Sequence, residues 1–292
     1  LFDSILKYFP GSPIIFSTWS NYKYVDSFDT LHPSVKVVLA KDPGPPSQTT
    51  LLDPLLQSNN INRHIASCQA GLPHVSTPFL CRMRPDFIFD SSRLLDILSN
   101  RCLSQKRPRG VFLFPILSLT HGTVSTYRRL GHARYPYHPS DLMHAGTLQD
   151  ISSLWSAPLM DDKDFAYFLH HHRQISPITK KYMGRYLCRF LPEQYLFTSY
   201  LKRHSLIDDD QFRDMYDEPS RNFALSRSLI DDSFVFAGFS QIGLYWHKQG
   251  NPFIYPVPFT KYKTVFIGSL RHHFSKYFPN AYGSGFKNLI IN

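Results

Sequence analysis

Two arginines and a carboxylate alternate within one short segment of the chain. Residues 82–86 read Arg-Met-Arg-Pro-Asp, so Arg82, Arg84 and Asp86 share one face of an extended strand. A diphosphate leaving group needs counter-charge, supplied either by Arg and Lys or by a metal ion held on carboxylates. The segment therefore indicates a site for a phosphorylated ligand. An ion pair between Arg84 and Asp86 that only closes the strand is the alternative.

Two further acids are candidates for proton transfer. Asp141 follows a proline-rich loop, and Glu193 opens a predicted helix. Transfer of a group to a hydroxyl requires a base that removes its proton, and a carboxylate can serve as that base. Asp141 is the preferred candidate for this role, because Glu193 at a helix N-terminus could serve only to cap that helix.

Buried strands and helices must position these groups. Short apolar runs predict strands at residues 12–18, 35–40, 79–86 and 111–117. Apolar residues at helical spacing predict helices over 60–71 and 91–98, and later near 148–155, 163–172 and 193–204. Strands and aromatic-rich loops are expected after residue 231. The alternation of strand and helix over the first 120 residues favours an α/β fold with a mainly parallel sheet flanked by helices.

A sheet of this kind predicts where a ligand binds. Ligands of open parallel sheets lie beyond the carboxyl ends of the strands. In this chain the predicted strand ends carry Ser-Thr-Trp at 17–19, Lys-Asp-Pro-Gly at 41–44 and Arg-Pro-Asp at 84–86. One crevice could collect all three segments.

The composition narrows the class of partner. The formal net charge of +10 favours anionic partners, such as nucleotide diphosphates, nucleic acid or an anionic membrane face. No aromatic RNA-binding motif, zinc knuckle or Lys/Arg-rich run is present, which argues against nucleic acid. The basic and aromatic stretch 261–286 suits a membrane interface, although a packed terminus with solvated charges fits as well.

The cysteines and the apolar runs indicate the cell compartment in which we expect the protein. The four cysteines show neither Cys-x-x-Cys pairing nor zinc-ligand spacing. We expect reduced thiols in a cytoplasmic protein. The most apolar run, 111–119, is far shorter than the ~20 residues that cross a bilayer. The chain begins at Leu1 without a methionine, so we expect it to be part of something longer.

Four short motifs resemble, in order and spacing, those of the WavE-like lipopolysaccharide-synthesis proteins. The family pattern is roughly S-T-W, D-P-G, N-I-N-R-Q-I and K-x-R-x-D. The matching segments here are Ser17-Thr18-Trp19, Asp42-Pro43-Gly44, Asn60-Ile61-Asn62-Arg63-His64-Ile65 and Arg82-Met83-Arg84-Pro85-Asp86. The family's F-H-P-S-D…G…D and P-E-Q-Y segments resemble His138-Pro139-Ser140-Asp141, with Gly146 and Asp150, and Pro192-Glu193-Gln194-Tyr195. The resemblance covers residues 12 to about 200.

The resemblance implies a fold and an activity. Such proteins are similar to GT-A glycosyltransferases, which implies a GT-A-like, Rossmann-type domain over residues 1–230, with residues 231–292 as a C-terminal extension packed on the same domain. It also implies transfer of a sugar from a nucleotide-sugar donor to a surface polysaccharide or a lipid-linked glycan, in the cytoplasm or peripherally on the inner face of the membrane. A phosphoribosyl- or CMP-sugar-type transferase and a non-catalytic glycan-binding module are the alternatives.

The resemblance also implies roles for single residues. GT-A enzymes often hold Mn²⁺ or Mg²⁺ on a third-strand Asp-x-Asp motif, and Asp86 takes that place. Because only one acid stands there and Arg82 replaces the usual Lys, a metal-independent mechanism using Arg82 or Arg84 stays open. The donor contacts implied are the strand-end residues Ser17, Thr18 and Trp19 at the base or ribose, Asp42 near the base, and Asn60, Asn62 and Arg63 near the phosphates. The last three could instead form only a capped helix start.

Overall fold

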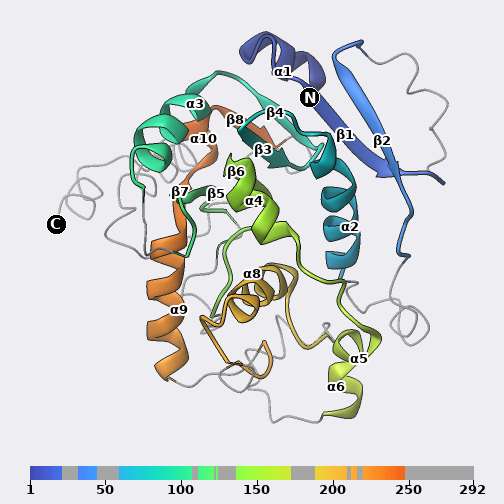
Figure 1. Cartoon of the computed structure of the whole chain (residues 1–292), viewed down its shortest axis with the longest axis vertical. Coiled ribbons are helices and arrows are strands. Elements are labelled where there is room, and N and C mark those ends of the chain that lie inside the picture. The colour runs from blue at the N-terminus through green and yellow to red at the C-terminus, as the bar shows by residue number, and fades with distance from the viewer. Residues whose placement is uncertain are drawn as a thin grey trace, which may run out of the picture.

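The computed structural model describes residues 1–21, 32–44, 59–106, 111–121, 123, 136–171, 188–208, 212–215 and 220–246. The basic and aromatic stretch 261–286 lies outside these residues. The described chain places helices on both faces of a central sheet (Figure 1). Among the helices described, none is long and apolar enough to cross a membrane.

A four-stranded sheet forms the centre of the fold, in the order β3-β6-β5-β7. Its strands are β3 (Phe79–Met83), β6 (Met143–Thr147), β5 (Ile116–Leu119) and β7 (Phe234–Ala237). β6 runs antiparallel to both β3 and β5, whereas β5 and β7 are parallel. The α/β class is confirmed, but the mainly parallel Rossmann-type sheet is corrected to a mixed one, because the chain enters β6 against the direction of the other three strands.

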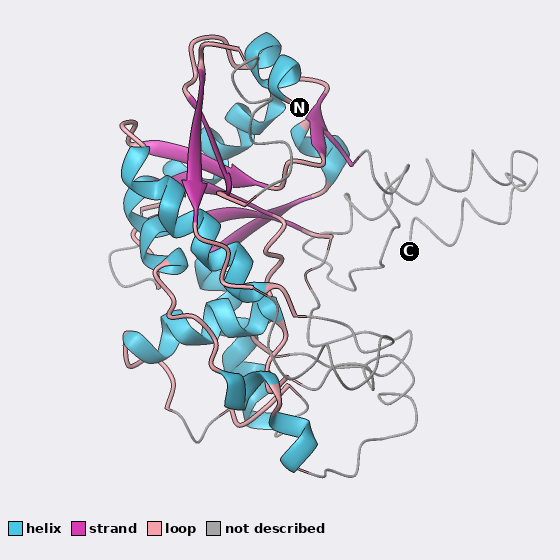
Figure 2. Ribbon diagram, turned by 90° about the vertical axis from the view of Figure 1, so that its right-hand side faces the viewer, coloured by secondary structure: helices cyan, strands magenta, loops and turns pink. Residues whose placement is uncertain are grey.

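Two smaller sheets complete the strand content that the structure describes. β1 (Ile14–Trp19) and β2 (Val35–Ala40) pair in parallel, from Ile14 opposite Val35 to Trp19 opposite Ala40. β4 (Phe87–Phe89) and β8 (Leu244–Trp246) pair antiparallel. Figure 2 shows the strands gathered in the upper half of the molecule, with helices filling the lower half.

Helices cover the two faces of the central sheet through separate hydrophobic clusters. One cluster takes residues from α2 (Ile61–Gly71), α4 (Leu148–Trp155), α8 (Pro192–Arg203) and α9 (Ser220–Ser233). The other takes residues from α3 (Arg93–Ile97), the π-helical turn Leu98–Leu103 and α10 (Phe239–Ile242), and α1 (Phe2–Tyr8) packs against it. Along β7, Phe234 and Phe236 enter the first cluster and Val235 and Ala237 the second, as alternation along a strand requires.

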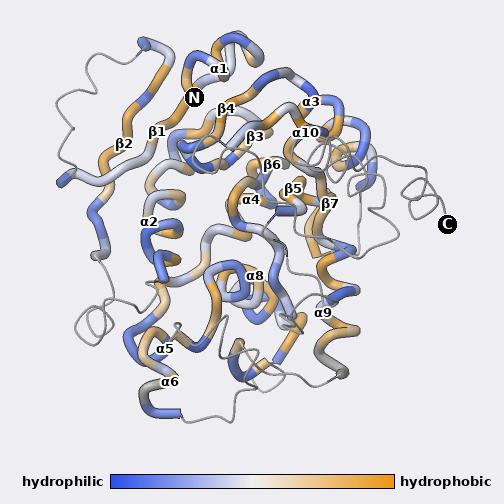
Figure 3. Tube along the Cα trace, turned by 180° about the vertical axis from the view of Figure 1, so that it is seen from behind, coloured by the Kyte–Doolittle hydropathy of each residue, from blue (hydrophilic) through white to orange (hydrophobic). Residues whose placement is uncertain are grey.

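Hydropathy follows this arrangement. β7 is hydrophobic along its length, whereas hydrophobic and hydrophilic residues alternate along α9 (Figure 3). A strand covered on both faces carries a continuous apolar run, and a helix covered on one side carries an apolar stripe. β7 therefore lies in the interior of the fold, and one side of α9 lies at its surface.

Several predicted elements are confirmed with shifted ends, and prolines account for two of the shifts. α2 begins at Ile61 and ends at Gly71, followed by a 3₁₀ turn (Leu72–His74) that contains Pro73. β5 begins only after Pro115, which has no N–H to donate to a sheet. β3 ends at Met83, shortly before Pro85. The helix expected at 163–172 is instead two short ones, α5 (Asp162–Phe165) and α6 (Tyr167–His170).

The elements not predicted from the sequence include α1, β4, β6, α9 and α10. β6 reads Met-His-Ala-Gly-Thr, which has little of the β-branched and aromatic character typical of strands. Its burial comes from its neighbours on both sides. The division of the chain at residue 230 stays a prediction; the described residues after it supply β7, α10 and β8.

Candidate functional site

Arg84 and Asp86 form a bidentate ion pair just beyond β3. Arg84 Nε lies 3.1 Å from Asp86 Oδ1 and Arg84 Nη2 lies 3.0 Å from Oδ2. The indole Nε1 of Trp246, in β8, donates to Oδ2 at 2.9 Å. Burial disfavours the ionised carboxyl group, but these hydrogen bonds and the charge of Arg84 outweigh it and lower the pKa of Asp86. Asp86 is thus an anion whose two oxygens are both occupied.

This arrangement does not fit the divalent cation expected at Asp86. A cation there would compete with Arg84 and Trp246 for the carboxylate and would be repelled by the guanidinium group. In the parts of the chain that the structure describes, no group of three or more His, Cys, Asp or Glu side chains could hold a metal ion. The strand-end ion pair considered from the sequence is present, and it keeps a guanidinium group next to the site.

Asp141 lies between two side chains contributed by other elements. It is 4% exposed, at the end of the loop that leads into β6. Its Oδ2 lies 3.0 Å from Nδ1 of His64, in the first turn of α2, and its backbone oxygen accepts a hydrogen bond from Arg82 of β3. Burial opposes ionisation of Asp141, but His64 and the charge of Arg82 outweigh it, so its pKa is lowered. Asp141 is therefore an anion buried between a histidine and an arginine.

Stacking and hydrogen bonding fix Arg82 itself. Its guanidinium carbon lies 4.1 Å from the ring centroid of Trp155, at the end of α4, a cation–π contact. Trp155 Nε1 in turn donates to Nδ1 of His144 at 3.1 Å. Burial, together with the charge of Arg82, lowers the pKa of His144 to about 3. His144 is neutral at physiological pH, and the positive charge of this cluster resides on Arg82.

Glu193 carries a second carboxyl group, and its pKa is shifted in the direction opposite to that of Asp141. It stands in the first turn of α8, its side chain is 20% exposed, and its Oε2 lies 3.3 Å from Nε2 of His138. Burial, and then repulsion from Asp141, raises the pKa of Glu193 well above its ordinary value. Capping of α8 falls to its neighbour, since Gln194 Oε1 accepts from the backbone N–H of Leu191. Glu193 is thus available for a role other than capping.

Other residues expected to contact the donor are bound to each other. Asp42, just after β2, forms a bidentate pair with Arg63 of α2, with distances of 2.9 and 2.8 Å, and its Oδ1 accepts from the backbone N–H of Gly44. This hydrogen bonding, although opposed by burial, lowers the pKa of Asp42. The pair joins the end of β2 to the start of α2.

The two asparagines of the same motif differ in their contacts. Asn62 donates to the backbone oxygen of Met160 at 2.9 Å and accepts from its N–H at 2.7 Å. Asn60 is exposed and makes no side-chain capping bond, while Asn59 Oδ1 accepts from the N–H of Ile61. Asn62 therefore ties α2 to the chain after α4, a structural role that competes with phosphate binding.

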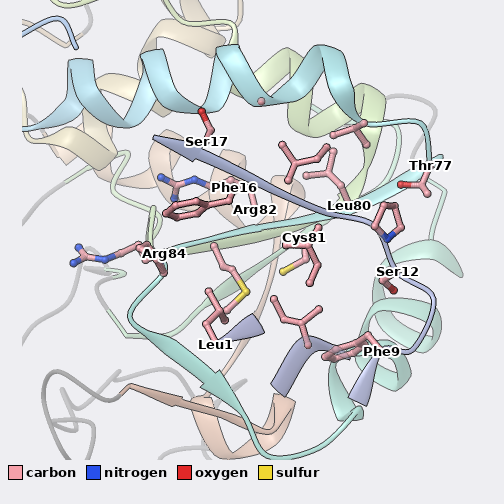
Figure 4. Close-up of a pocket in the computed structure, with 18 of the residues that line it drawn as sticks. Leu1, Phe9, Ser12, Phe16, Ser17, Thr77, Leu80, Cys81, Arg82 and Arg84 are labelled. Carbon is pink, nitrogen blue, oxygen red and sulfur yellow. The ribbon is translucent and has the colours of Figure 1, made fainter. Parts of the chain in front are cut away.

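The serine, threonine and tryptophan of the first motif lie at the carboxyl end of β1. Thr18 is buried and Trp19 is opposite Ala40, so the ends of β1 and β2 are adjacent, as expected. The buried Oγ of Ser17 has no hydrogen-bond partner among the described residues. Ser17, His64, Arg82 and Arg84 line a common cavity of about 550 Å³ (Figure 4). The structure thus brings one donor-site candidate from β1 together with both arginines.

The histidines of the cluster were not predicted as site residues. His64 carried a signal, because the family-like motif has Gln at this position and His stands here. His138 belonged to a quoted motif, but nothing in the sequence paired it with Glu193. His144 and Trp155 could be found only from the tertiary structure, which stacks α4 beside β3.

Fold and cluster together define an α/β protein whose site holds, beside two arginines, two carboxyl groups with pKa values shifted in opposite directions. The chain belongs to the WavE lipopolysaccharide synthesis family, whose sequence profile matches residues 1–243. The match spans every site residue expected from the sequence, from Ser17 to Glu193, and ends before Trp246. A search among curated proteins found no match.

Proposed function

We propose that this chain is a glycosyltransferase that moves a sugar from a nucleotide-sugar donor to a surface-polysaccharide or lipid-linked glycan acceptor. Membership of a lipopolysaccharide synthesis family supports a product of that class. The observation that carries the chemistry is the pair Asp141 and Glu193, whose pKa values move in opposite directions. Paired carboxyl groups separated in this way are typical of sites that move protons.

Asp141 is the group proposed to accept the proton of the acceptor hydroxyl. Its pKa is lowered whereas that of Glu193 is raised, so Asp141 is ionised at neutral pH and can take up a proton. Because an ionised carboxylate only accepts hydrogen bonds, Nδ1 of His64 must carry the hydrogen between them. His64 is then a positioning residue that holds the carboxylate in place.

The proposed reaction forms one bond at the anomeric carbon of the sugar and breaks another. The acceptor oxygen forms a bond to the anomeric carbon of the sugar while the bond from that carbon to the donor phosphate breaks. The proton of the acceptor hydroxyl passes to Asp141, and the phosphate leaves with the bonding electrons. Arg82 supplies the positive charge that stabilises the leaving phosphate. The raised pKa of Glu193 favours its protonated form, which donates a hydrogen bond to the sugar or the acceptor.

The remaining donor contacts are part of the same proposal. Ser17, Thr18 and Trp19 lie at the end of β1, where a nucleoside would approach the arginines. A bound divalent cation would supply Lewis-acid charge, but the contacts of Asp86 do not favour it, so no step depends on one. A lipid-linked acceptor would put the reaction at the cytoplasmic face of a membrane.

A donor and acceptor assay with one matched pair of variants tests the proposal. Candidate nucleotide sugars are incubated with oligosaccharides from lipopolysaccharide, and both nucleotide release and transfer are measured. We expect Asp141→Asn to lower transfer by about 10²–10⁴-fold, the usual contribution of a general base. Asp90→Asn, at the exposed Arg93–Asp90 pair, should leave transfer unchanged. Donor binding without turnover in the wild-type chain would favour a non-catalytic glycan-binding module instead.

A further inference from the structure

The cavity beside the arginines is much larger and more apolar than a phosphate site requires. It lies among α1, β1, α2, β3 and α3, and its volume of about 550 Å³ falls within the roughly 300–1,000 Å³ of pockets that bind small ligands. Most of its wall is hydrocarbon, including Phe2, Ile5, Phe9, Phe16, Leu80 and Leu94. Such a wall offers no hydrogen bonds to a sugar or a nucleobase.

The two arginines that line this cavity lie on one side of it, whereas the hydroxyls of Ser12 and Thr77 lie on the other. In Figure 4, Ser17, Arg82 and Arg84 lie on one side, and Phe9 and Leu80 lie on the other. The buried Ser17 Oγ, which has no partner among the described residues, is on the side of the arginines. Two guanidinium groups and a hydroxyl at one end of an apolar cavity form a site for an anionic head with a hydrocarbon tail.

The thiols in the wall add no charge. Cys68 of α2 and Cys81 of β3 both line the cavity, and burial raises the pKa of each to about 12. They are protonated at neutral pH and behave as small apolar groups. The charge in the cavity therefore comes from the arginines, on one side alone.

Helix α1 closes the cavity on one side without being buried itself. Phe2 and Ile5 point inward and line the cavity, and Phe2 packs edge-on against Phe16 of β1 with ring centroids 5.5 Å apart. Yet no residue of α1 is fully buried. The apolar side chains of α1 that line the cavity offer hydrocarbon surface to an apolar occupant.

We propose that this cavity binds the hydrocarbon chain of a single-chain lipid phosphate, with the lipid phosphate at Arg84, while Arg82 keeps the leaving phosphate of the donor. The inference rests on the proposed function and specifies it: the acceptor glycan is carried on a lipid phosphate whose chain enters the cavity. The sugar end then lies next to His64, which lines the cavity and contacts Asp141.

Binding is tested by calorimetric titration of the full chain with farnesyl phosphate, farnesol and inorganic phosphate. We expect farnesyl phosphate to bind more tightly than either of the others, since only it has both parts. Ile5→Trp should weaken farnesyl phosphate binding about tenfold, the effect of roughly two methylene groups losing their buried position. Val75→Trp, in a loop that lines the cavity, repeats the test if the change in α1 impairs folding.

The control is Leu159→Trp, an exposed position outside the cavity, which should leave the affinity unchanged. Equal affinities for farnesol and farnesyl phosphate, or no effect of either filling variant, would overturn the inference. Transfer to a lipid-free oligosaccharide is measured in parallel. Transfer without lipid binding leaves the proposed function standing and removes the cavity's role, whereas lipid binding without any transfer does the reverse.

Discussion

His64 Nδ1 lies 3.0 Å from Asp141 Oδ2, although 77 residues separate the two along the chain. The contact joins the first turn of α2 to the entrance of β6, and Arg82 of β3 hydrogen-bonds the backbone of the same aspartate. Three elements therefore fix one carboxylate. This rigidity is what a proton-accepting group needs, because proton transfer depends on hydrogen-bond geometry.

The hydrogen bond to Asp141 predicts different results for two replacements of His64. A Gln amide can donate to the carboxylate as Nδ1 does, so His64→Gln should keep most of the transfer activity. His64→Leu, similar in bulk but without a donor, should lower kcat by about tenfold or more, since a charged hydrogen bond contributes roughly 1.5–3 kcal/mol. Steady-state kinetics of both variants check this, with His74→Gln at an exposed site as control. Equal losses in Gln and Leu would instead assign the imidazole a role of its own.

Glu193 and Asp141 predict opposite effects of pH on stability. The pKa of Glu193 is raised in the folded state, so it costs stability as pH rises from its ordinary value of 4.5 through the folded pKa. The pKa of Asp141 is lowered, so its contribution is present above its ordinary value of 3.8 and is lost in stronger acid. Urea unfolding across pH should show that Glu193→Gln loses the decline above pH 4.5. An unchanged decline in the variant would contradict the raised pKa.

The ion pair at Asp86 predicts donor binding that does not depend on a metal. Asp86→Asn keeps an oxygen to accept from Trp246 and removes the charge that Arg84 neutralises. Thermal shift by a nucleotide-sugar donor should therefore persist in EDTA and in Asp86→Asn, because bound ligand stabilises the folded state by mass action. It should fall in Arg82→Gln. A shift that requires Mn²⁺ and vanishes in Asp86→Asn would assign the metal role to Asp86 after all.

Asn62 and Asn60 are two residues apart, and we predict that replacing Asn62 lowers stability whereas replacing Asn60 does not. Asn62→Ala leaves the N–H and the carbonyl of Met160 without the side chain that pairs with both, which should cost roughly 1–3 kcal/mol of unfolding free energy. Asn60→Ala changes an exposed side chain and should stay within about 0.5 kcal/mol. Chemical denaturation measures both. A matched loss in the two variants would refute the tie between α2 and Met160.

The sequence predicted those elements whose own residues show a regular pattern of apolar positions. Ile61, Ile65 and Cys68 recur at helical spacing, and they are the buried stripe of α2. β6 escaped prediction because its residues have no strand character of their own, and its burial is imposed by β3 and β5. Because β6 was not predicted, its antiparallel direction was not predicted either, and the sheet was expected to be mainly parallel.

The contacts of the site also differ in whether a local sequence pattern could predict them. Arg84 and Asp86 are two residues apart, so their pairing could be anticipated from the strand period. The proximity of Asp141 and Glu193, which moves their pKa values, depends on how α8 packs beside the entrance to β6. No local pattern encodes that packing. Asp42, Asn62 and Arg63 were placed near the phosphates by resemblance, and the contacts they make explain their presence in structural terms.

The parallel pairing of β5 with β7 bears on how the chain folds. Ile116 lies opposite Phe234, with well over a hundred residues between them. Pairings so distant along the chain form slowly, because a large loop must close before any contact repays its entropy. Until β7 arrives, the edge of β5 is exposed, and an apolar strand edge of this kind recruits other chains. A nascent chain that stops before Phe234 should therefore aggregate, because the edge of β5 stays exposed until β7 has been synthesised and paired with it.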